Sequence, residues 1–165
     1  MGLRRLNLSY TSENRYIINK STVFIKVKSL TKRWVTGFSA AKDAIVYSEG
    51  KCPGHFLGSA IFHGNRLLCV GNNTLGKSKP GNTVIKENGT EYNISCHAEQ
   101  AAVDKIKHRE GNTTNLIMYV VRVNSEGAFV NSRPCNMCLD YMKKYGIKTV
   151  RFINKLGIPE ELKLT

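Results

Sequence analysis

Residues 134–138 read PCNMC, so two cysteines stand three positions apart directly after a proline. Cysteines at this spacing form either a redox pair or half of a zinc site, and two residues alone do not separate these roles from chance. Proline is typical of the first positions of a helix. The motif therefore predicts Cys135 and Cys138 on one face of a helix, in its first turn, where unpaired amides and the positive end of the helix dipole favour thiolates.

A zinc site needs about four ligands, usually cysteine and histidine, and a catalytic site leaves one position for water. His97 stands at the start of another expected helix, in CHAE, with Glu99 two residues later. Residues two apart are rotated by roughly 200° inside a helix, so both can serve one metal only if it lies off the helix end. The pattern predicts His97, Cys135 and Cys138 as ligands, with Glu99 as an acid/base beside the metal.

A closed zinc knuckle formed by Cys96 together with His97, Cys135 and Cys138 is the alternative, and it leaves Glu99 without a role. The other three histidines are expected to be surface or packing residues: His55, His63 and His108.

The composition indicates one soluble domain. The chain has 165 residues, of which 41% are hydrophobic, and no apolar run of about 18 residues that could span a membrane. The N-terminus has no apolar stretch typical of a secretory signal. An odd number of cysteines, five, then favours a reducing compartment, cytoplasmic or nuclear, with Cys52, Cys69 and Cys96 as free thiols.

The formal net charge of +13 is large for this length. It is compatible with a solvated surface of no specific function, with a polyanionic partner, or with phosphorylated substrates attracted by the positive electrostatic field of the protein. Basic residues are dense near the N-terminus, and residues 1–29 are interpreted as a separate basic segment, an extra strand or an arm. Residues 30–165 are interpreted as the single folded domain.

Hydrophobic periodicity predicts the elements of that domain. A helix is expected from about residue 31 towards Gly50, because apolar residues from Trp34 to Ile45 recur every three or four positions. Two apolar runs joined by HGN predict a hairpin over residues 55–72. NLIMYVVRV reads as a strand buried on both faces, followed by a turn region or short hairpin over 124–133. KTVRFIN reads as another strand, after a helix that stops at Gly146.

Residues 72–95 are polar, and an Asn-Gly turn between β-prone arms predicts a projecting hairpin within them. Ser95 is expected to cap the helix that carries CHAE, which should stop at Gly111. The last eleven residues carry only a weak pattern. Strands separated by helices indicate a layered α/β domain with about five strands.

HAEQAAV followed by PCNMCLDYM resembles the cytidine/deoxycytidylate deaminase superfamily, whose signature is H-x-E…P-C-x-x-C. Together with GIKTVRFI, which is similar to deoxycytidylate and tRNA-adenosine deaminases, the resemblance covers roughly residues 31–153. It implies a three-layer α/β/α fold with a central mixed sheet and a zinc site at two helix N-termini. It implies one Zn²⁺ per chain, since the extra cysteine and histidine set of larger deoxycytidylate enzymes is not found.

The resemblance also implies roles for individual residues. Zinc on the three ligands would activate water, while Glu99 moves protons between water, the ring nitrogen and the leaving ammonia. Asn73, after the second strand, and the Ala98 backbone amide would contact the substrate. Lys77 and Lys79 could meet a phosphate, although they could equally belong to a solvated loop. Most relatives are oligomers, so a dimer or larger assembly is expected.

The resemblance leads to a zinc-dependent hydrolase that acts on the C–N bond of a cyclic amidine. The expected substrate is a cytosine nucleotide of the dCMP, CMP or dCTP class, although the C-terminus is short and lacks the last helix of that branch. The alternative is a deaminase of single-stranded DNA or RNA, including tRNA adenosine, favoured by the charge and by Met137. Against it, scattered tyrosines do not form an aromatic groove for stacking bases. A zinc-stabilised nucleic-acid-binding module without turnover is the third interpretation.

Overall fold

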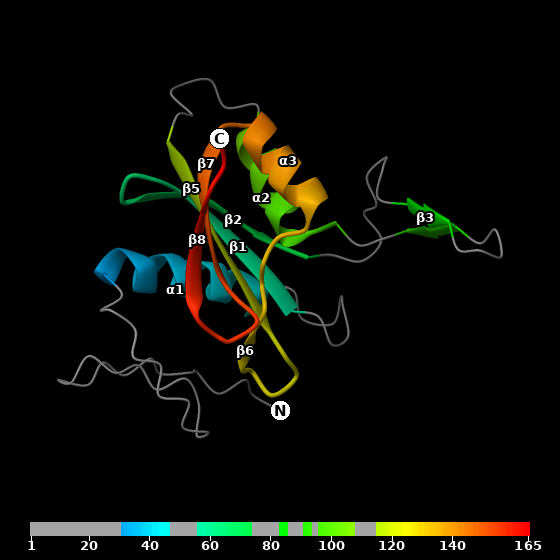
Figure 1. Ribbon diagram of the computed structural model, residues 1–165, viewed down its shortest axis with the longest axis horizontal. Coiled ribbons are helices and arrows are strands. Elements are labelled where there is room, and N and C mark those ends of the chain that lie inside the picture. The colour runs from blue at the N-terminus through cyan, green and yellow to red at the C-terminus, as the bar shows by residue number, and fades with distance from the viewer. Residues whose placement is uncertain (1–30, 47–55, 74–82, 86–90, 94–95, 108–114) are drawn as a thin grey trace.

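The computed structural model describes residues 31–46, 56–73, 83–85, 91–93, 96–107 and 115–165 (Figure 1). The three helices are α1 (Lys32–Val46), α2 (Ala98–Ile106) and α3 (Asn136–Lys144). The strands are β1 (Phe56–His63), β2 (Arg66–Asn72), β3 (Thr83–Ile85), β4 (Glu91–Asn93), β5 (Leu116–Val123), β6 (Phe129–Val130), β7 (Ile147–Ile153) and β8 (Pro159–Lys163).

One mixed sheet of six strands organises the described residues, in the order β2-β1-β5-β7-β8 with β6 paired to β5. The β5–β7 pair is parallel, and α3 forms its crossover, whereas the other pairs of this sheet are antiparallel. Helices α2 and α3 lie side by side on one face and α1 lies across the other (Figure 1). The three-layer α/β/α fold expected from the sequence is thereby confirmed.

The sheet separates two apolar clusters. Beneath α2 and α3, Val103, Met142 and Phe152 are fully buried, and the zinc-motif residue Cys138 belongs to the same cluster. Beneath α1, Phe38 packs edge-on against the ring of Tyr119 from β5. Continuous burial along β5 explains why NLIMYVVRV shows no polar alternation, because each face of this central strand is covered by helices.

Most of the predicted elements are confirmed. The helix over residues 32–46, the β1–β2 hairpin with Gly64 at positive φ, and the short β5–β6 hairpin form where the patterns predict them. Strands β3 and β4 pair antiparallel and project from the body of the domain, as the Asn-Gly turn predicts (Figure 1). Gly146, at φ 85°, follows α3 in the left-handed conformation typical of a helix end.

Two sequence-based predictions, both about α2, are wrong in detail. The N-cap of α2 is His97, not Ser95, and the helix ends at Ile106, the last buried residue of its apolar face, rather than at Gly111. The sheet has six strands, in agreement with the expected number of about five, and its edge strand β8 comes from the weakly patterned C-terminus. Its sequence PEELK has no apolar alternation, and β8 is held instead by pairing with β7 and by an ion pair from Arg151 to Glu161.

No helix in the described part of the chain is long and apolar enough to cross a membrane. The basic segment of residues 1–29, together with Lys77 and Lys79, lies outside the described residues.

Candidate metal centre and active site

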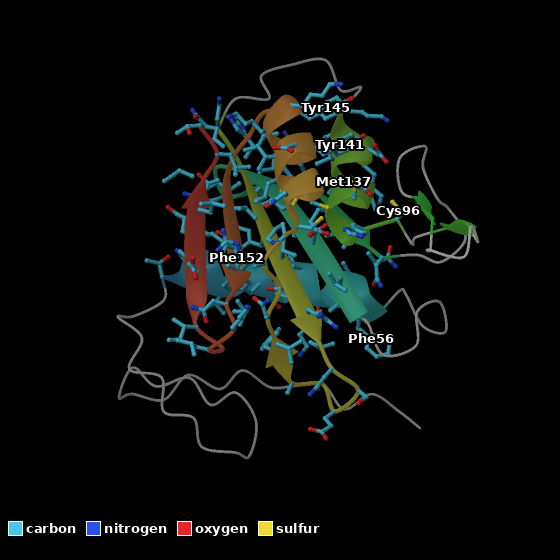
Figure 2. All side chains as sticks on the ribbon, turned by 45° about the vertical axis from the view of Figure 1, so that its right-hand side comes forward. Phe56, Cys96, Met137, Tyr141, Tyr145 and Phe152 are labelled. Atoms are coloured by element: carbon cyan, nitrogen blue, oxygen red, sulfur yellow. The ribbon has the colours of Figure 1, made fainter. Side chains whose placement is uncertain are left out.

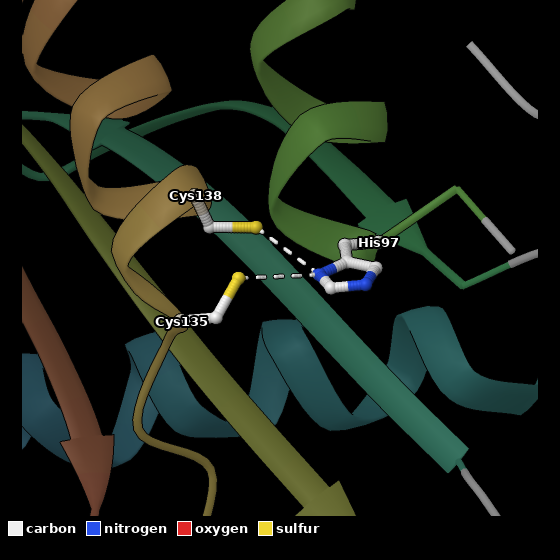
Figure 3. A group of neighbouring side chains, drawn as sticks. All are labelled: His97, Cys135 and Cys138. Carbon is white, nitrogen blue, oxygen red and sulfur yellow. Dashed lines mark hydrogen bonds between the residues drawn. The ribbon is translucent and has the colours of Figure 1, made fainter. Parts of the chain in front are cut away.

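The side chains of His97, Cys135 and Cys138 meet where the N-termini of α2 and α3 come together (Figure 3). The His97 Nδ1 lies 3.2 Å from the Cys138 Sγ and 3.7 Å from the Cys135 Sγ. All three donor atoms lie within 4.8 Å of one another. Residues about forty positions apart are thus brought to one point, as the motifs predict.

The positions at which α2 and α3 begin determine where these side chains point. His97 and Cys135 occupy the N-cap positions of α2 and α3, each with extended backbone (ψ 148° and 162°) and without a side-chain cap hydrogen bond. An N-cap side chain usually accepts a hydrogen bond from its own helix, so these two are available for another partner. Cys138 is in the first turn of α3, whereas Cys135 precedes that turn, which slightly corrects the predicted placement.

The donor set fits a tetrahedral zinc ion. Zinc–sulfur and zinc–nitrogen bonds of about 2.3 and 2.1 Å place neighbouring tetrahedral donors roughly 3.6–3.8 Å apart. The His97–Cys135 separation agrees with this value, and the His97–Cys138 pair would need to open by a few tenths of an ångström. Cys96 is not a member of this three-residue group, and its Sγ instead contacts the His97 carbonyl at 3.6 Å. Three protein donors leave the fourth position that a catalytic site requires.

Burial raises the pKa of the Cys138 thiol, and the nearby Glu99 and Cys135 raise it further. A thiol in such surroundings stays protonated until a cation stabilises the thiolate. A divalent metal supplies that charge, so the electrostatics of the site as well as its donor spacing suit Zn²⁺.

Glu99 is the buried acid of the site, with 2% of its surface exposed. Burial raises the pKa of Glu99, against smaller lowering effects from its own backbone N–H and from His97. Its Oε2 atom has no hydrogen-bond partner among the described residues. Buried polar atoms are normally paired, so an unpaired carboxyl oxygen beside the metal donors points to a group that acts on a bound molecule.

The start of α2 is held against the sheet by contacts that the motifs did not reveal. The buried Ser59 hydroxyl of β1 donates to the carbonyl of Ala98 at 2.7 Å, and Ala98 stands between the candidate ligand His97 and the buried Glu99. A side chain at Gly71 of β2 would collide with that same carbonyl oxygen. The only sequence signals for these contacts are a serine within an apolar strand and a glycine at the end of the next strand.

The start of α3 is anchored by Ser132, which is buried three residues before Cys135. Its hydroxyl donates to the Val120 carbonyl at 2.8 Å and accepts the Ile153 N–H at 2.9 Å, so β5 and β7 both hold this loop. Further along α3, the Tyr141 hydroxyl donates to Asp104 of α2 at 2.6 Å. The residues joined by these hydrogen bonds are far apart in the sequence, so the local sequence pattern could not predict the contacts.

The predicted substrate-binding residues Ala98 and Asn73 are both buried near the ends of their elements. Ala98 is fully buried at the first position of α2. Asn73 is buried after β2, and its Oδ1 accepts the Leu57 N–H at 3.0 Å, which gives it a structural role at the start of β1. Exposed His63 ends β1, as expected of a surface residue.

Comparisons with known proteins agree with this geometry. Residues 34–154 match the family described as the cytidine and deoxycytidylate deaminase zinc-binding region. A cytidine deaminase from Burkholderia pseudomallei superposes with a TM-score of 0.54 at 17% identity, covering 79% of this chain and 91% of that one. No curated protein matches the chain.

Two other solved structures are less similar. A cytidine deaminase from Mycobacterium leprae gives a TM-score of 0.48 at 20% identity, with 78% and 92% of the two chains covered. A dCMP deaminase from the cyanophage S-TIM5 gives 0.47 at 16% identity, with 73% and 82% covered. The family match extends over most of the described domain and includes His97, Glu99, Cys135 and Cys138. The chain therefore belongs to the family of the cytidine and deoxycytidylate deaminase zinc-binding region.

Proposed function

We propose that the protein is a zinc-dependent hydrolytic deaminase that converts the cytosine base of a free nucleotide to uracil and releases ammonia. The observation that carries the proposal is the meeting of His97, Cys135 and Cys138 beside the unpaired, buried Oε2 of Glu99. The family match supports the reaction type. The family description names deoxycytidylate, a nucleotide, beside cytidine, and we extend a nucleotide substrate to this chain as part of the proposal.

In this mechanism Glu99 transfers protons and the three donors hold the metal. When bound, zinc supplies the electrophilic activation of water that hydrolytic deamination requires. Glu99 takes a proton from the attacking water and delivers it to the ring nitrogen as the water oxygen bonds to the ring carbon. It then carries the remaining proton of the added hydroxyl to the exocyclic amine, the C–N bond breaks, ammonia leaves, and the ring carbon keeps the oxygen as a carbonyl. The raised pKa of Glu99 suits a group that must both accept and return a proton near neutral pH.

We also propose that the Ala98 backbone amide and Asn73 contact the substrate, and that Lys77 and Lys79 face its phosphate. The buried position of Ala98 between His97 and Glu99 supports its part. The Asn73 Oδ1 already accepts a backbone hydrogen bond, so a substrate contact would use its amide group.

Deamination by zinc-loaded protein of a panel of nucleosides, nucleotides and oligonucleotides, read by mass spectrometry, tests the proposal. We expect dCMP, CMP or dCTP to gain about 1 Da as amine is replaced by oxygen, and Glu99→Gln to reduce turnover by roughly 10²- to 10⁴-fold while keeping zinc. A Glu99→Gln protein with unchanged turnover would contradict the assignment.

A polynucleotide deaminase is the second candidate, favoured by the net charge of +13. Turnover confined to oligonucleotides, with strongly salt-dependent binding, would select it over the nucleotide enzyme. Zinc that only stabilises the fold, without turnover of any cytosine or adenine compound, would leave a binding module.

A further inference from the structure

Arg133 is a charged residue that the proposed mechanism does not use, and it stands two residues before the metal donor Cys135. Its side chain is exposed, and none of the described carboxylates forms an ion pair with it. An exposed arginine on a mobile loop would have little meaning, since surface charges are common in a chain of this charge. The backbone next to Arg133 is, however, held by hydrogen bonds to the sheet.

The two neighbours of Arg133 in the chain are both buried. Ser132 is anchored by hydrogen bonds to β5 and β7, including one from its own N–H to the Ile153 carbonyl at 2.8 Å. Pro134 is buried and has a fixed φ, and Cys135 caps α3. The position of Arg133 relative to the metal donors is therefore set by the sheet.

The guanidinium of Arg133 lies over the ring of Phe152 from β7. Its Cζ lies 5.9 Å from the centre of the Phe152 ring, and Phe152 is fully buried in the apolar cluster that contains Cys138. Figure 2 shows Phe152 on β7, and Phe152 belongs to the same apolar cluster as Met142 of α3. Contact with an aromatic face restricts the side chain, so less conformational entropy is lost when the guanidinium binds a ligand.

We propose that Arg133 binds a phosphate group of the substrate and so makes the enzyme select phosphorylated cytosine compounds over the nucleoside. This inference rests on the proposed function and names the substrate group that Arg133 recognises. A planar guanidinium matches phosphate oxygens with two parallel hydrogen bonds, which lysine cannot reproduce. The phosphate is either the 5′-phosphate of a mononucleotide or a phosphodiester of a polynucleotide.

Steady-state kinetics of Arg133→Gln on deoxycytidine, dCMP and a short oligodeoxycytidylate test the proposal. We expect kcat/KM for the phosphorylated substrate to fall roughly 10- to 100-fold, the usual loss for a hydrogen bond to a charged group, mostly through KM. Turnover of deoxycytidine should change less than about twofold. A loss with dCMP identifies the 5′-phosphate, and a loss only with the oligonucleotide identifies a phosphodiester.

Arg66→Gln is the matched control, because Arg66 is also exposed and carries the same charge, at the start of β2. It removes the same net charge and should leave all three rates unchanged. Equal losses in Arg133→Gln and Arg66→Gln, or equal losses on deoxycytidine and dCMP, would overturn the specific role of Arg133.

A binding measurement separates this proposal from the deaminase activity. In zinc-loaded protein, the NMR signal of the Arg133 Nε–H group should shift on titration with inorganic phosphate and with dCMP. This signal is identified by its absence from the spectrum of Arg133→Gln. If that signal shifts while no base is deaminated, the proposed reaction fails and the phosphate site stands. If it does not move with either titrant, the phosphate site is wrong even when the enzyme is active.

Discussion

At the residue scale, two buried groups at the helix N-termini are both costly to ionise. Cys138 is fully buried and Glu99 nearly so, and burial raises the pKa of both groups. A divalent cation stabilises a site that concentrates potential negative charge in this way. The chemistry of the site therefore depends on metal binding, and substitutions here should affect metal content before they affect the fold.

Substitution of Cys138 by alanine is expected to abolish stoichiometric zinc binding. The affinity loss should exceed the roughly 10- to 100-fold that removal of an outer partner of a metal ligand costs. Atomic absorption on purified protein and a chelator competition assay measure it. Cys69→Ala is the matched control, because Cys69 lies outside the metal group and its Sγ donates to the Ala102 carbonyl instead, and the variant should retain one zinc per chain. Full zinc content in Cys138→Ala would contradict the ligand assignment.

Glu161 on β8 gives a pH-dependent contribution to stability. Burial alone would raise its pKa, but hydrogen bonds and charge from Arg151 and Lys163 outweigh this effect and lower the pKa below the usual 4.5. A lowered pKa in the folded protein means that the contribution is complete above about pH 4.5 and is lost as the pH falls through the folded-state pKa. Glu161→Gln should therefore destabilise the protein at pH 7 and progressively less below pH 4.5.

Urea unfolding of wild type and Glu161→Gln between pH 7 and pH 3 measures this difference. Glu126→Gln, in the exposed β5–β6 turn, is the control and should show no such pH-dependent difference. A stability difference between wild type and Glu161→Gln that stays constant over the whole range would show that charge at Glu161 is not involved.

At the scale of elements, glycines let helices approach the sheet on both faces. At Gly58 of β1, a Cβ atom would collide with the Ala41 carbonyl of α1, and at Gly71 of β2 it would collide with the Ala98 carbonyl of α2. Both obstacles are backbone atoms, which cannot turn aside as a side chain can. Close packing at Gly71 fixes the backbone of Ala98, which stands between the proposed ligand His97 and the proposed acid/base Glu99.

Gly71→Ala is expected to displace the first turn of α2. Overpacking of this kind costs roughly 1–3 kcal/mol of stability, and we expect zinc affinity to fall as well because His97 moves with the helix. Denaturant unfolding and metal competition measure the two effects. Gly157→Asn is the control, since Gly157 has open space around it, and asparagine tolerates its φ of 76°. Zinc affinity equal to wild type in Gly71→Ala would show that the helix start does not depend on this contact.

On the scale of the whole molecule, we propose two roles for the net charge of +13, and different parts of the chain carry them. Arg133 stands two residues before the candidate metal donor Cys135, whereas the basic residues of segment 1–29 precede the family match, which begins at residue 34. We propose that residues 30–165 are the folded deaminase domain and that segment 1–29 adds long-range attraction to polyanions. Dimer or larger assembly remains a proposal, which sedimentation of the zinc-loaded protein would test.

Deletion of residues 1–29 is expected to leave zinc content and nucleotide turnover unchanged within about twofold. Binding of a single-stranded oligonucleotide should weaken, and its dependence on salt concentration should become less steep because fewer phosphates are neutralised. Fluorescence anisotropy at several salt concentrations measures this. Loss of zinc or of folded structure in the truncated protein would show that the segment belongs to the domain.

Much of the site could be predicted from sequence because its chemistry is local. His97 with Glu99, and Cys135 with Cys138, each lie within one short segment at a helix start. The helical periodicity of α1 and the continuous apolar run of β5 reflect the burial of these two elements. Strand β8 could not be found in this way, because PEELK is stabilised by partners on β7 rather than by an apolar face of its own.

The sequence by itself determined which side chains could bind zinc and transfer protons, since those properties belong to the residue types and their spacing. Only the tertiary structure decided that the three donors converge, that Cys96 is not one of them, and that Ser59, Gly71 and Ser132 position the helix starts. The physical reason is that such contacts join residues far apart in the chain, and their geometry depends on how the helices pack against the common sheet.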